Sequence, residues 1–176
     1  MVALPRNPSN SAFLQASKYQ IIFPRITTVT YFCQDVNIPG LNANPVRSPT
    51  PFVDLYKPTD KLEYGMLRIS FILDEEMWNW EIIQSWLRGY SFPCSFAEYK
   101  NMDRKSLYSL HQERPQYADA QLLILSGLNN VKFKIKFIDA FPVSLSEVPF
   151  STKSSAEETM VASAEFRYQL FNIERN

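Results

Sequence analysis

Alternating apolar and polar positions predict strands in both halves of the chain. In "MLRISFIL", residues 66–73, apolar side chains occupy every second position and arginine and serine lie between them, which is the period of a half-buried strand. Residues 17–24 and 28–40 are rich in β-branched and aromatic side chains. They predict two further strands, joined by a short turn around residues 25–27.

The second half of the chain continues this pattern. Residues 121–141, "QLLILSGLNNVKFKIKFIDAF", predict two strands joined by a turn near residues 127–130. In the second of them, apolar residues that face the core alternate with a basic strip in water, formed by Lys132, Lys134 and Lys136. A last strand is expected within residues 160–174, with one face made of Ala162, Ala164, Phe166, Tyr168 and Leu170.

One segment, "FILDEEMWNWEIIQSWLRG" at residues 71–89, predicts the main helix, at about residues 74–88. Asp74 is a suitable N-cap, the acidic residues that follow suit the positive end of the helix dipole, and Gly89 is expected to end the helix. At about 100° per residue the apolar side chains span an arc of roughly 200°, interrupted by Asn79. They are Trp78, Trp80, Ile82, Ile83, Trp86 and Leu87.

Such an arc is wider than a helix needs when it lies on a single sheet. We therefore expect two surfaces to cover this helix. The second cover is either the chain's own proline-rich segment or another subunit, since tryptophans favour interfaces. The pattern does not choose between them.

Between these elements lie two long segments without a sustained period. Residues 41–60 carry four prolines, which remove backbone donors and favour extended geometry, and they predict a long extended arm. Residues 90–121 mix charged, aromatic and proline residues and are expected to form a surface insertion. With residues 1–12 as a flexible start, residues 1–176 form one domain, mainly β with one prominent helix, an α+β architecture.

Composition narrows the function classes. Lysine plus arginine and aspartate plus glutamate both number 18, so a zero net charge gives no general argument for nucleic acid or acidic membranes. No segment is long and apolar enough to suggest a membrane span or a signal peptide, and a soluble protein made in the cytosol is expected. Cys33 and Cys94 match no metal-binding spacing, so neither a metal site nor a disulfide is expected.

Candidates for catalysis are few. The acidic run of Asp74, Glu75 and Glu76 is the best one, but adjacent helix residues point about 100° apart and cannot converge on one ion alone. A dipole-stabilised helix start is the favoured interpretation. His111 is the only histidine and has no partner for a triad, and four glycines leave little material for a phosphate loop. No catalytic residue and no cofactor is predicted.

Three blocks of sequence, in their order, resemble one family. "VNIPG" at residues 36–40 is followed by the strand-to-helix segment at residues 67–89 and by "FPVSLSEVPFS" at residues 141–151. The most specific parts are residues 71–76 with Trp80, Trp86 and Gly89, and the motif at residues 145–148 with Phe150. The chain is similar to the tail tube terminator proteins, also called tail completion and sheath stabiliser proteins, of T-even-type contractile-tailed bacteriophages.

The resemblance implies a structural virion protein with a fold related to the tail tube subunit, an antiparallel β-sandwich or partial barrel with a flanking helix. It implies a homo-hexameric ring on the neck-proximal end of the phage tail tube, which ends tube polymerisation and contacts tail tube subunits and the sheath terminator or neck proteins. DNA would pass through the lumen, no membrane would be involved, and the ring would assemble in the host cytoplasm. The basic strip would face the lumen or the sheath.

Three other interpretations remain at this level. The first is a tail tube subunit or a baseplate tube initiator, because the strand-to-helix junction has a distant echo in both. The second is a hydrolase that uses the acidic run, and the third is a nucleic-acid binding module built on the basic strip, with strongly salt-dependent affinity. Within the tail interpretation, we hypothesise that the arm or the insertion replaces the face by which a tube polymerises.

Overall fold

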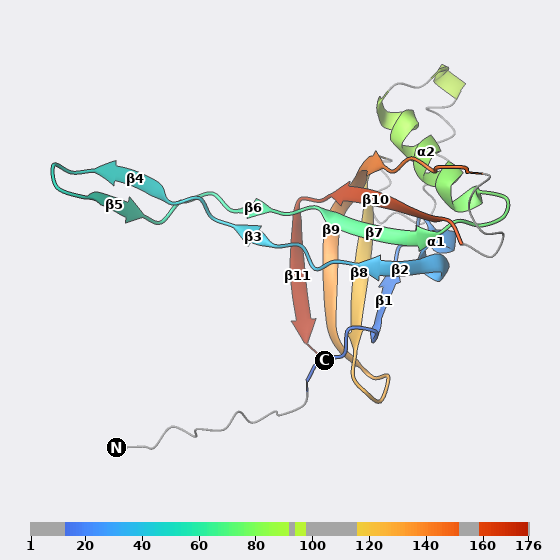
Figure 1. Cartoon of the computed structure of the whole chain (residues 1–176), viewed down its shortest axis with the longest axis horizontal. Coiled ribbons are helices and arrows are strands. Elements are labelled where there is room, and N and C mark those ends of the chain that lie inside the picture. The colour runs from blue at the N-terminus through green and yellow to red at the C-terminus, as the bar shows by residue number, and fades with distance from the viewer. Residues whose placement is uncertain (1–12, 92–93, 98–115, 152–158, 176) are drawn as a thin grey trace.

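The computed structural model of this protein describes residues 13–91, 94–97, 116–151 and 159–175 (Figure 1). The expected mainly β fold with one main helix is confirmed, and the described strands are antiparallel without closing into a barrel. The helices are α1 (Thr27–Phe32) and α2 (Trp78–Ser91). The strands are β1 (Tyr19–Ile22), β2 (Cys33–Val36), β3 (Leu41–Asn42), β4 (Val46–Pro49), β5 (Asp54–Lys57), β6 (Glu63–Tyr64), β7 (Leu67–Ile72), β8 (Ala118–Leu125), β9 (Val131–Leu145), β10 (Val161–Arg167) and β11 (Leu170–Arg175).

Two sheets share the long strand β9. The first half of β9 pairs with β8 and β11, and β8 in turn pairs with β1, so this sheet has the order β1-β8-β9-β11. The second half of β9 pairs with β10 in a second sheet of order β9-β10-β7-β2. The strands of the two sheets cross at a steep angle in Figure 1. We call them the first and second sheets.

The strand β9 changes sheets at Asp139. This residue has a backbone φ of 54°, in the left-handed region that aspartate tolerates better than most residues. Its backbone N–H donates to Asp119 Oδ1 at 3.2 Å, across a point where the register between β8 and β9 shifts. The bend redirects the second half of β9 toward β10.

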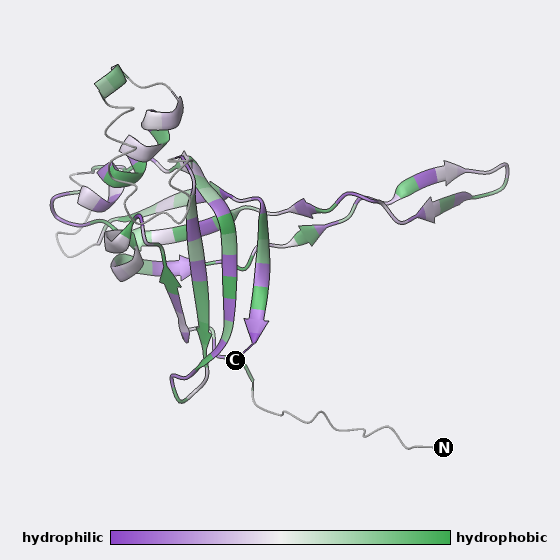
Figure 2. Ribbon diagram, turned by 180° about the vertical axis from the view of Figure 1, so that it is seen from behind, coloured by the Kyte–Doolittle hydropathy of each residue, from purple (hydrophilic) through white to green (hydrophobic). Residues whose placement is uncertain are grey.

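The core lies where the two sheets and the two helices face each other. Apolar rows from the first sheet, such as Ile21, Leu122 and Ile135, are almost fully buried. An aromatic group joins the layers: the ring centroids of Phe23, Trp86 and Phe166 lie 5.0 to 6.1 Å apart. Apolar and polar residues alternate along the long strands of the first sheet (Figure 2), and this alternation gives each strand one face that can be buried in the core.

The strand predicted for residues 28–40 is wrong in its first half. Residues 27–32 form α1, and β2 begins at Cys33. Ile26 and Val29, three positions apart, are both buried, which a helical turn permits and a strand does not. Thr30 Oγ1 accepts a hydrogen bond from the Phe23 backbone N–H at 3.1 Å and so closes this turn. Tertiary burial therefore overrides the β preference of "TTVTYF".

The main helix starts and ends later than predicted, since α2 spans residues 78–91. Asp74 is not its N-cap: the Asp74 carbonyl accepts from the Met77 N–H at 2.9 Å in a turn, and Met77 has a φ of 55°. The acidic run precedes the first helical turn. Gly89 does not end the helix either, because it is buried within its last turns.

Two other boundaries differ from the prediction. The last strand divides into β10 and β11, because the chain passes from the second sheet to the first between them. Leu170 is 36% exposed, although the single-strand pattern placed it on the same face as Ala162 and Ala164, which are buried. The predicted insertion at residues 90–121 contains the end of α2 and the start of β8 at Ala118, whose side chain is buried. His111 and residues 1–12 lie outside the described residues.

Candidate assembly surfaces

An arm projects from the second sheet (Figure 1). The hairpin of β2 and β7 continues outward through two more ladders, first β3 with β6 and then β4 with β5. Residues 41–64 thus run out and back as one ribbon, and we call this ribbon the arm. Its backbone is extended, but it is paired with itself and does not lie on the body of the molecule.

Two glycines form the base of the arm. The Gly65 N–H donates to the Gly40 carbonyl at 2.8 Å, where the outgoing and returning chains meet. A Cβ atom at Gly65 would lie 3.1 Å from the Gly40 oxygen and 3.2 Å from its nitrogen, whereas one at Gly40 would meet nothing within 4 Å. The close backbone approach therefore disfavours a side chain at residue 65 more than at residue 40.

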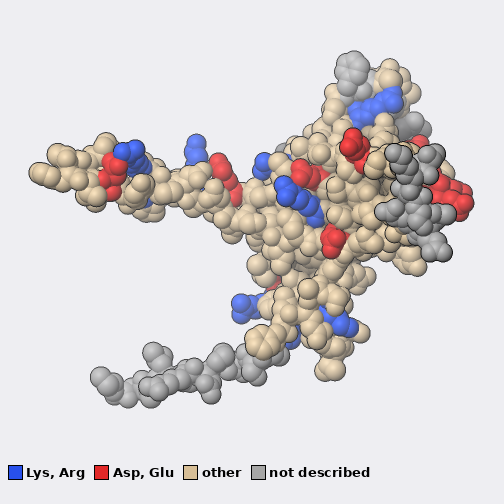
Figure 3. All heavy atoms as spheres, in the orientation of Figure 1, with Lys and Arg blue, Asp and Glu red and all other residues tan. Residues whose placement is uncertain are grey.

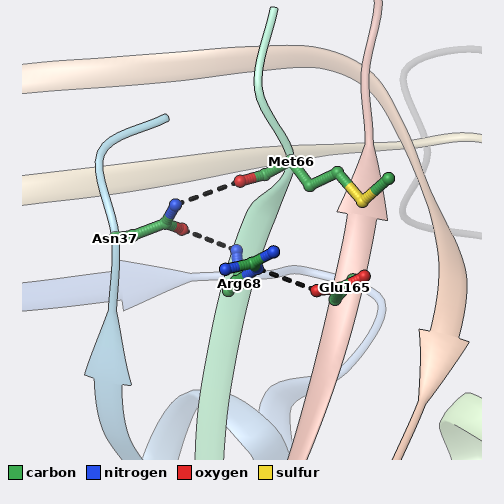
Figure 4. Close-up of polar contacts among 4 residues, drawn as sticks. All are labelled: Asn37, Met66, Arg68 and Glu165. Carbon is green, nitrogen blue, oxygen red and sulfur yellow. Dashed lines mark hydrogen bonds and ion pairs between the residues drawn. The ribbon is translucent and has the colours of Figure 1, made fainter. Parts of the chain in front are cut away.

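Side chains hold the same base to the second sheet (Figure 4). Asn37 Nδ2 donates to the Met66 carbonyl at 3.0 Å, and Asn37 Oδ1 accepts from the Arg68 backbone N–H at 2.6 Å. Arg68 also forms an ion pair with Glu165 on β10, with Nε and Oε1 2.8 Å apart. A side-chain amide thus extends the ladder beyond β2 and fixes the direction in which the arm leaves.

The arm also contacts β11. Arg167 Nη1 donates to the Tyr64 carbonyl at 3.1 Å. The Tyr64 ring packs edge-on against Phe171, with centroids 5.6 Å apart, and against Tyr168 at 5.9 Å. The arm therefore leaves the body over the β11 edge of the first sheet.

The outer part of the arm exposes apolar side chains. Phe52 at the tip is 99% exposed, and Val46, Val53 and Leu55 are each more than half exposed. Thr50 Oγ1 accepts from the Val53 N–H at 3.3 Å, which closes the tip and presents Phe52 outward. Sequence reasoning found the arm but missed this tip, although "PTPFVDLY" carries the signal of apolar residues between prolines.

The basic strip lies on the face of the first sheet that points away from the core. Lys134 is paired with Leu123 and Glu174, and Lys136 with Gln121 and Asn172, whereas the next residue in the strand, Phe137, is fully buried. Lys136 Nζ forms an ion pair with Glu174 at 2.7 Å, so part of the positive charge is neutralised. Elsewhere, acidic and basic groups are interspersed on the face drawn in Figure 3.

The helix residues divide into two sets. Ile83 and Trp86 are buried in the core, and Trp86 Nε1 donates to the Gln116 carbonyl at 3.0 Å. Trp80, Ile82 and Leu87 are partly buried, while Trp78 is 53% exposed. The arm does not cover α2, because it leaves from the opposite side of the molecule (Figure 1). The prediction that the chain's own proline-rich segment covers this helix is therefore wrong. The helix packs on β9 and α1.

One cation, Arg25, and one thiol, Cys33, near this core have shifted pKa values. Burial lowers the pKa of Arg25 to about 10, and its guanidinium lies 4.4 Å from the centroid of the Trp86 ring. Burial also raises the pKa of the Cys33 thiol to about 11, against a smaller opposing effect of the Tyr19 hydrogen bond. Cys33 is therefore a neutral thiol at physiological pH, not an activated nucleophile.

A hollow of about 650 Å³ opens between β1, α1 and β2. It lies on the side of the first sheet opposite β11, next to the β1 edge. Tyr31 at its rim is 83% exposed. Besides Tyr31, the lining residues with side-chain polar groups are Ser17, Tyr19, Gln20, Thr27, Thr30 and Gln34, together with Cys33.

The acidic run offers no site for chemistry. Glu76 accepts a hydrogen bond from the Trp78 indole N–H, and Asp74 belongs to the turn before α2. Among the described residues, no three His, Cys, Asp or Glu side chains are grouped so that they could hold a metal ion. Within the same part of the chain, no helix has the length and apolar character needed to cross a membrane.

Crossed antiparallel sheets with a flanking helix and a long arm define a structural β-domain whose prominent features are surfaces for assembly. A sequence model of the family described as "Phage tail tube protein" matches residues 7–174. The chain belongs to this family of phage tail proteins, which are structural components, and it is not an enzyme.

Particular relatives narrow the comparison. The tail tube terminator protein of Enterobacteria phage T4 is 25% identical over 166 residues, which cover 91% of this chain and 88% of that protein. Among solved structures, the anti-feeding prophage cap (AFP tube terminating cap) has a TM-score of 0.58 at 13% identity and covers 97% of this chain and 96% of the other. The sheath/tube terminator of the PVC extracellular contractile injection system has a TM-score of 0.55 at 9% identity, with coverages of 93% and 98%. Both structures share the fold.

Proposed function

We propose that this protein is a tail tube terminator that forms a hexameric ring on the head-proximal end of a contractile phage tail. The ring ends tube polymerisation, stabilises the sheath end and provides the surface for neck attachment. The likeness over most of both chains to the T4 tail tube terminator supports this choice within the family. The partners would be tail tube subunits and the sheath terminator or neck proteins. The protein would work in the virion after assembly in the host cytoplasm.

One observation supports the proposed ring: among the strands that the structure describes, the first sheet has two open strand edges. Within the described strands, β1 and β11 each have a single strand neighbour and lie at the two opposite edges of the first sheet. An unpaired edge is a template for strand addition, so β11 of one copy can pair with β1 of the next. These are two different surfaces, and a heterologous contact of this kind generates a closed ring when the rotation between copies closes.

In such a ring, one face of the first sheet would line a lumen. The core lies on the other face, so the lumen face would be the polar one that carries Lys134 and Lys136. DNA would pass this face in transit, and exposed lysines would interact with phosphates without reading sequence. Replacing Lys132, Lys134 and Lys136 with glutamine should then change DNA ejection, and normal ejection would remove the lumen role in favour of a sheath-facing strip.

A terminator must also differ from a tube subunit on one of its stacking faces. We propose that the arm or the segment at residues 90–121 replaces the face by which tube rings add to one another. A variant without residues 43–62 would test the first version. If it still formed rings and still controlled tube length, the arm would not be the modified face.

Negative-stain imaging of the purified protein, alone and with preformed tail tubes, tests the function. We expect six-fold rings that cap tube ends and do not extend them. A tail tube subunit or baseplate initiator is the second candidate, favoured by the family's description as tube proteins. It would instead form long open tubes at high concentration or start them. A protein that stays monomeric and does not bind tubes would exclude the terminator.

A further inference from the structure

The outer part of the arm exposes apolar side chains on one face of its ladder and at its tip. In the ladder of β4 and β5, Val46 and Leu55 lie on one face, opposite Lys57 and Ser48. The other face carries Tyr56, Pro49 and the ion pair of Arg47 and Asp54, whose Nη2 and Oδ2 atoms are 2.5 Å apart. Val46 and Leu55 are 55% and 52% exposed. We call these two residues, with Phe52 and Val53 at the tip, the apolar arm face. A lone two-stranded hairpin is at best marginally stable in water, so this face indicates a partner.

Charge identifies the kind of partner. Residues 41–64 carry three basic residues, Arg47, Lys57 and Lys61, and three acidic ones, Asp54, Asp60 and Glu63. A surface with no net charge and apolar side chains at its outer end does not suit a polyanion, because nucleic acid and acidic lipid binding depend on a basic surface. It suits the surface of a protein.

The direction of the arm identifies which protein surface it can reach. Asn37, Gly65 and the Tyr64–Phe171 contact fix the base of the arm so that it leaves over the β11 edge. The hollow is lined by residues of β1, α1 and β2. These elements lie at the other edge of the first sheet, away from β11 (Figure 1). If β11 of one copy meets β1 of the next, the arm passes directly over the β1 side of that neighbour.

We propose that the arm of each copy packs, through its apolar arm face, on the neighbouring copy of this chain in the ring, over the hollow between β1, α1 and β2. The inference rests on the proposed ring. The hollow is lined by hydroxyl, amide and thiol groups and bordered by the exposed ring of Tyr31, which gives the arm both polar partners and an aromatic contact. Each subunit would thereby clasp the next.

Site-specific photo-cross-linking of the full chain tests this contact. Benzoylphenylalanine in place of Phe52 or of Leu55 should give products of twice the chain mass. Their cross-linked peptides should contain residues 17–34 of a second copy. The matched control is the same probe in place of Leu128, which is 85% exposed in the turn between β8 and β9 and lies away from the arm. Cross-links that map elsewhere, or only to tube subunits when tubes are added, would overturn the proposal.

A second measurement tests the arm contact separately from the proposal that the protein forms a ring. Leu55→Ser combined with Phe52→Ser should raise the dissociation constant of the ring at least about tenfold, as expected for central apolar anchors, while Leu128→Ser should leave it unchanged. Mass photometry and negative stain count the rings. If wild-type rings form and the arm variants form them equally well, the clasp is refuted and the ring stands. If the wild-type chain never forms rings, both proposals fail.

Discussion

Asn79→Leu should destabilise the protein substantially, because Asn79 is a fully buried polar residue that joins α2 to the end of β7. Its Nδ2 donates to the Ile72 carbonyl at 2.7 Å, and its Oδ1 accepts from the Trp80 backbone N–H at 2.9 Å. Trp80 lies in the first helical turn, where backbone N–H groups have no acceptor within the helix. In sequence, Asn79 only interrupts an apolar arc.

The magnitude follows from these two groups. Leaving a buried donor or acceptor without its partner costs about 1–3 kcal/mol each, and the extra burial of the leucine side chain offsets part of the sum. We expect a loss of about 2–4 kcal/mol in the free energy of unfolding. For a chain of this size, that corresponds to a melting temperature lower by about 5–15 °C.

Urea denaturation followed by tryptophan fluorescence, together with a thermal melt, measures this loss. Asn172→Ala, at an exposed position on β11, is the matched control and should change stability by no more than about 0.5 kcal/mol. Hydrogen exchange should locate the effect at the start of α2. If Asn79→Leu changed the unfolding free energy by less than about 0.5 kcal/mol, the role given to its hydrogen bonds would be wrong.

Three further predictions concern the arm, the core and alkaline pH. Gly65→Ala should speed hydrogen exchange at the base of the arm, because its Cβ would crowd the Gly40 backbone, whereas Gly40→Ala should not. Ile83→Ala should cost about 2–5 kcal/mol in a denaturant titration, since this side chain is fully buried on α2. The raised pKa values of Cys33, about 11, and Tyr168, about 12, favour their neutral forms in the folded state. Their stabilisation is therefore complete below pH 9 and is lost as pH rises through 11 and then 12. Cys33→Ala should flatten the loss between pH 9 and 11, and an unchanged pH profile would contradict this assignment.

Much of the fold could be predicted from local patterns. The alternation in residues 66–73 and 131–137 identified β7 and the first half of β9, because one face of each strand is buried against the core. The dense apolar pattern after residue 76 identified α2. These predictions succeeded where a single periodicity runs through an element that has one buried face.

The predictions of secondary structure failed where contacts between residues far apart in the chain determine the local conformation. Residues 27–32 have β-forming side chains, yet burial of Ile26 and Val29 makes them helical. The acidic run looked like a helix start, but a turn at Met77 and the buried side chain of Asn79 delay the helix. Local propensities are worth a few tenths of a kcal/mol per residue, whereas burying one large apolar side chain is worth about 1.5–3 kcal/mol.

The candidate surfaces divide in the same way. The sequence by itself determined most of the longer strands, the presence of the main helix, the basic strip and the existence of an extended arm, because these depend on neighbours within a few residues. Only the tertiary structure decided that β9 serves two sheets, that the arm pairs with itself and leaves over β11, and that the hollow lies beside the opposite edge. These features depend on hydrogen bonds between residues far apart in the chain, such as Gly40 with Gly65 and Asp119 with Asp139, and no local pattern encodes which distant edges will meet.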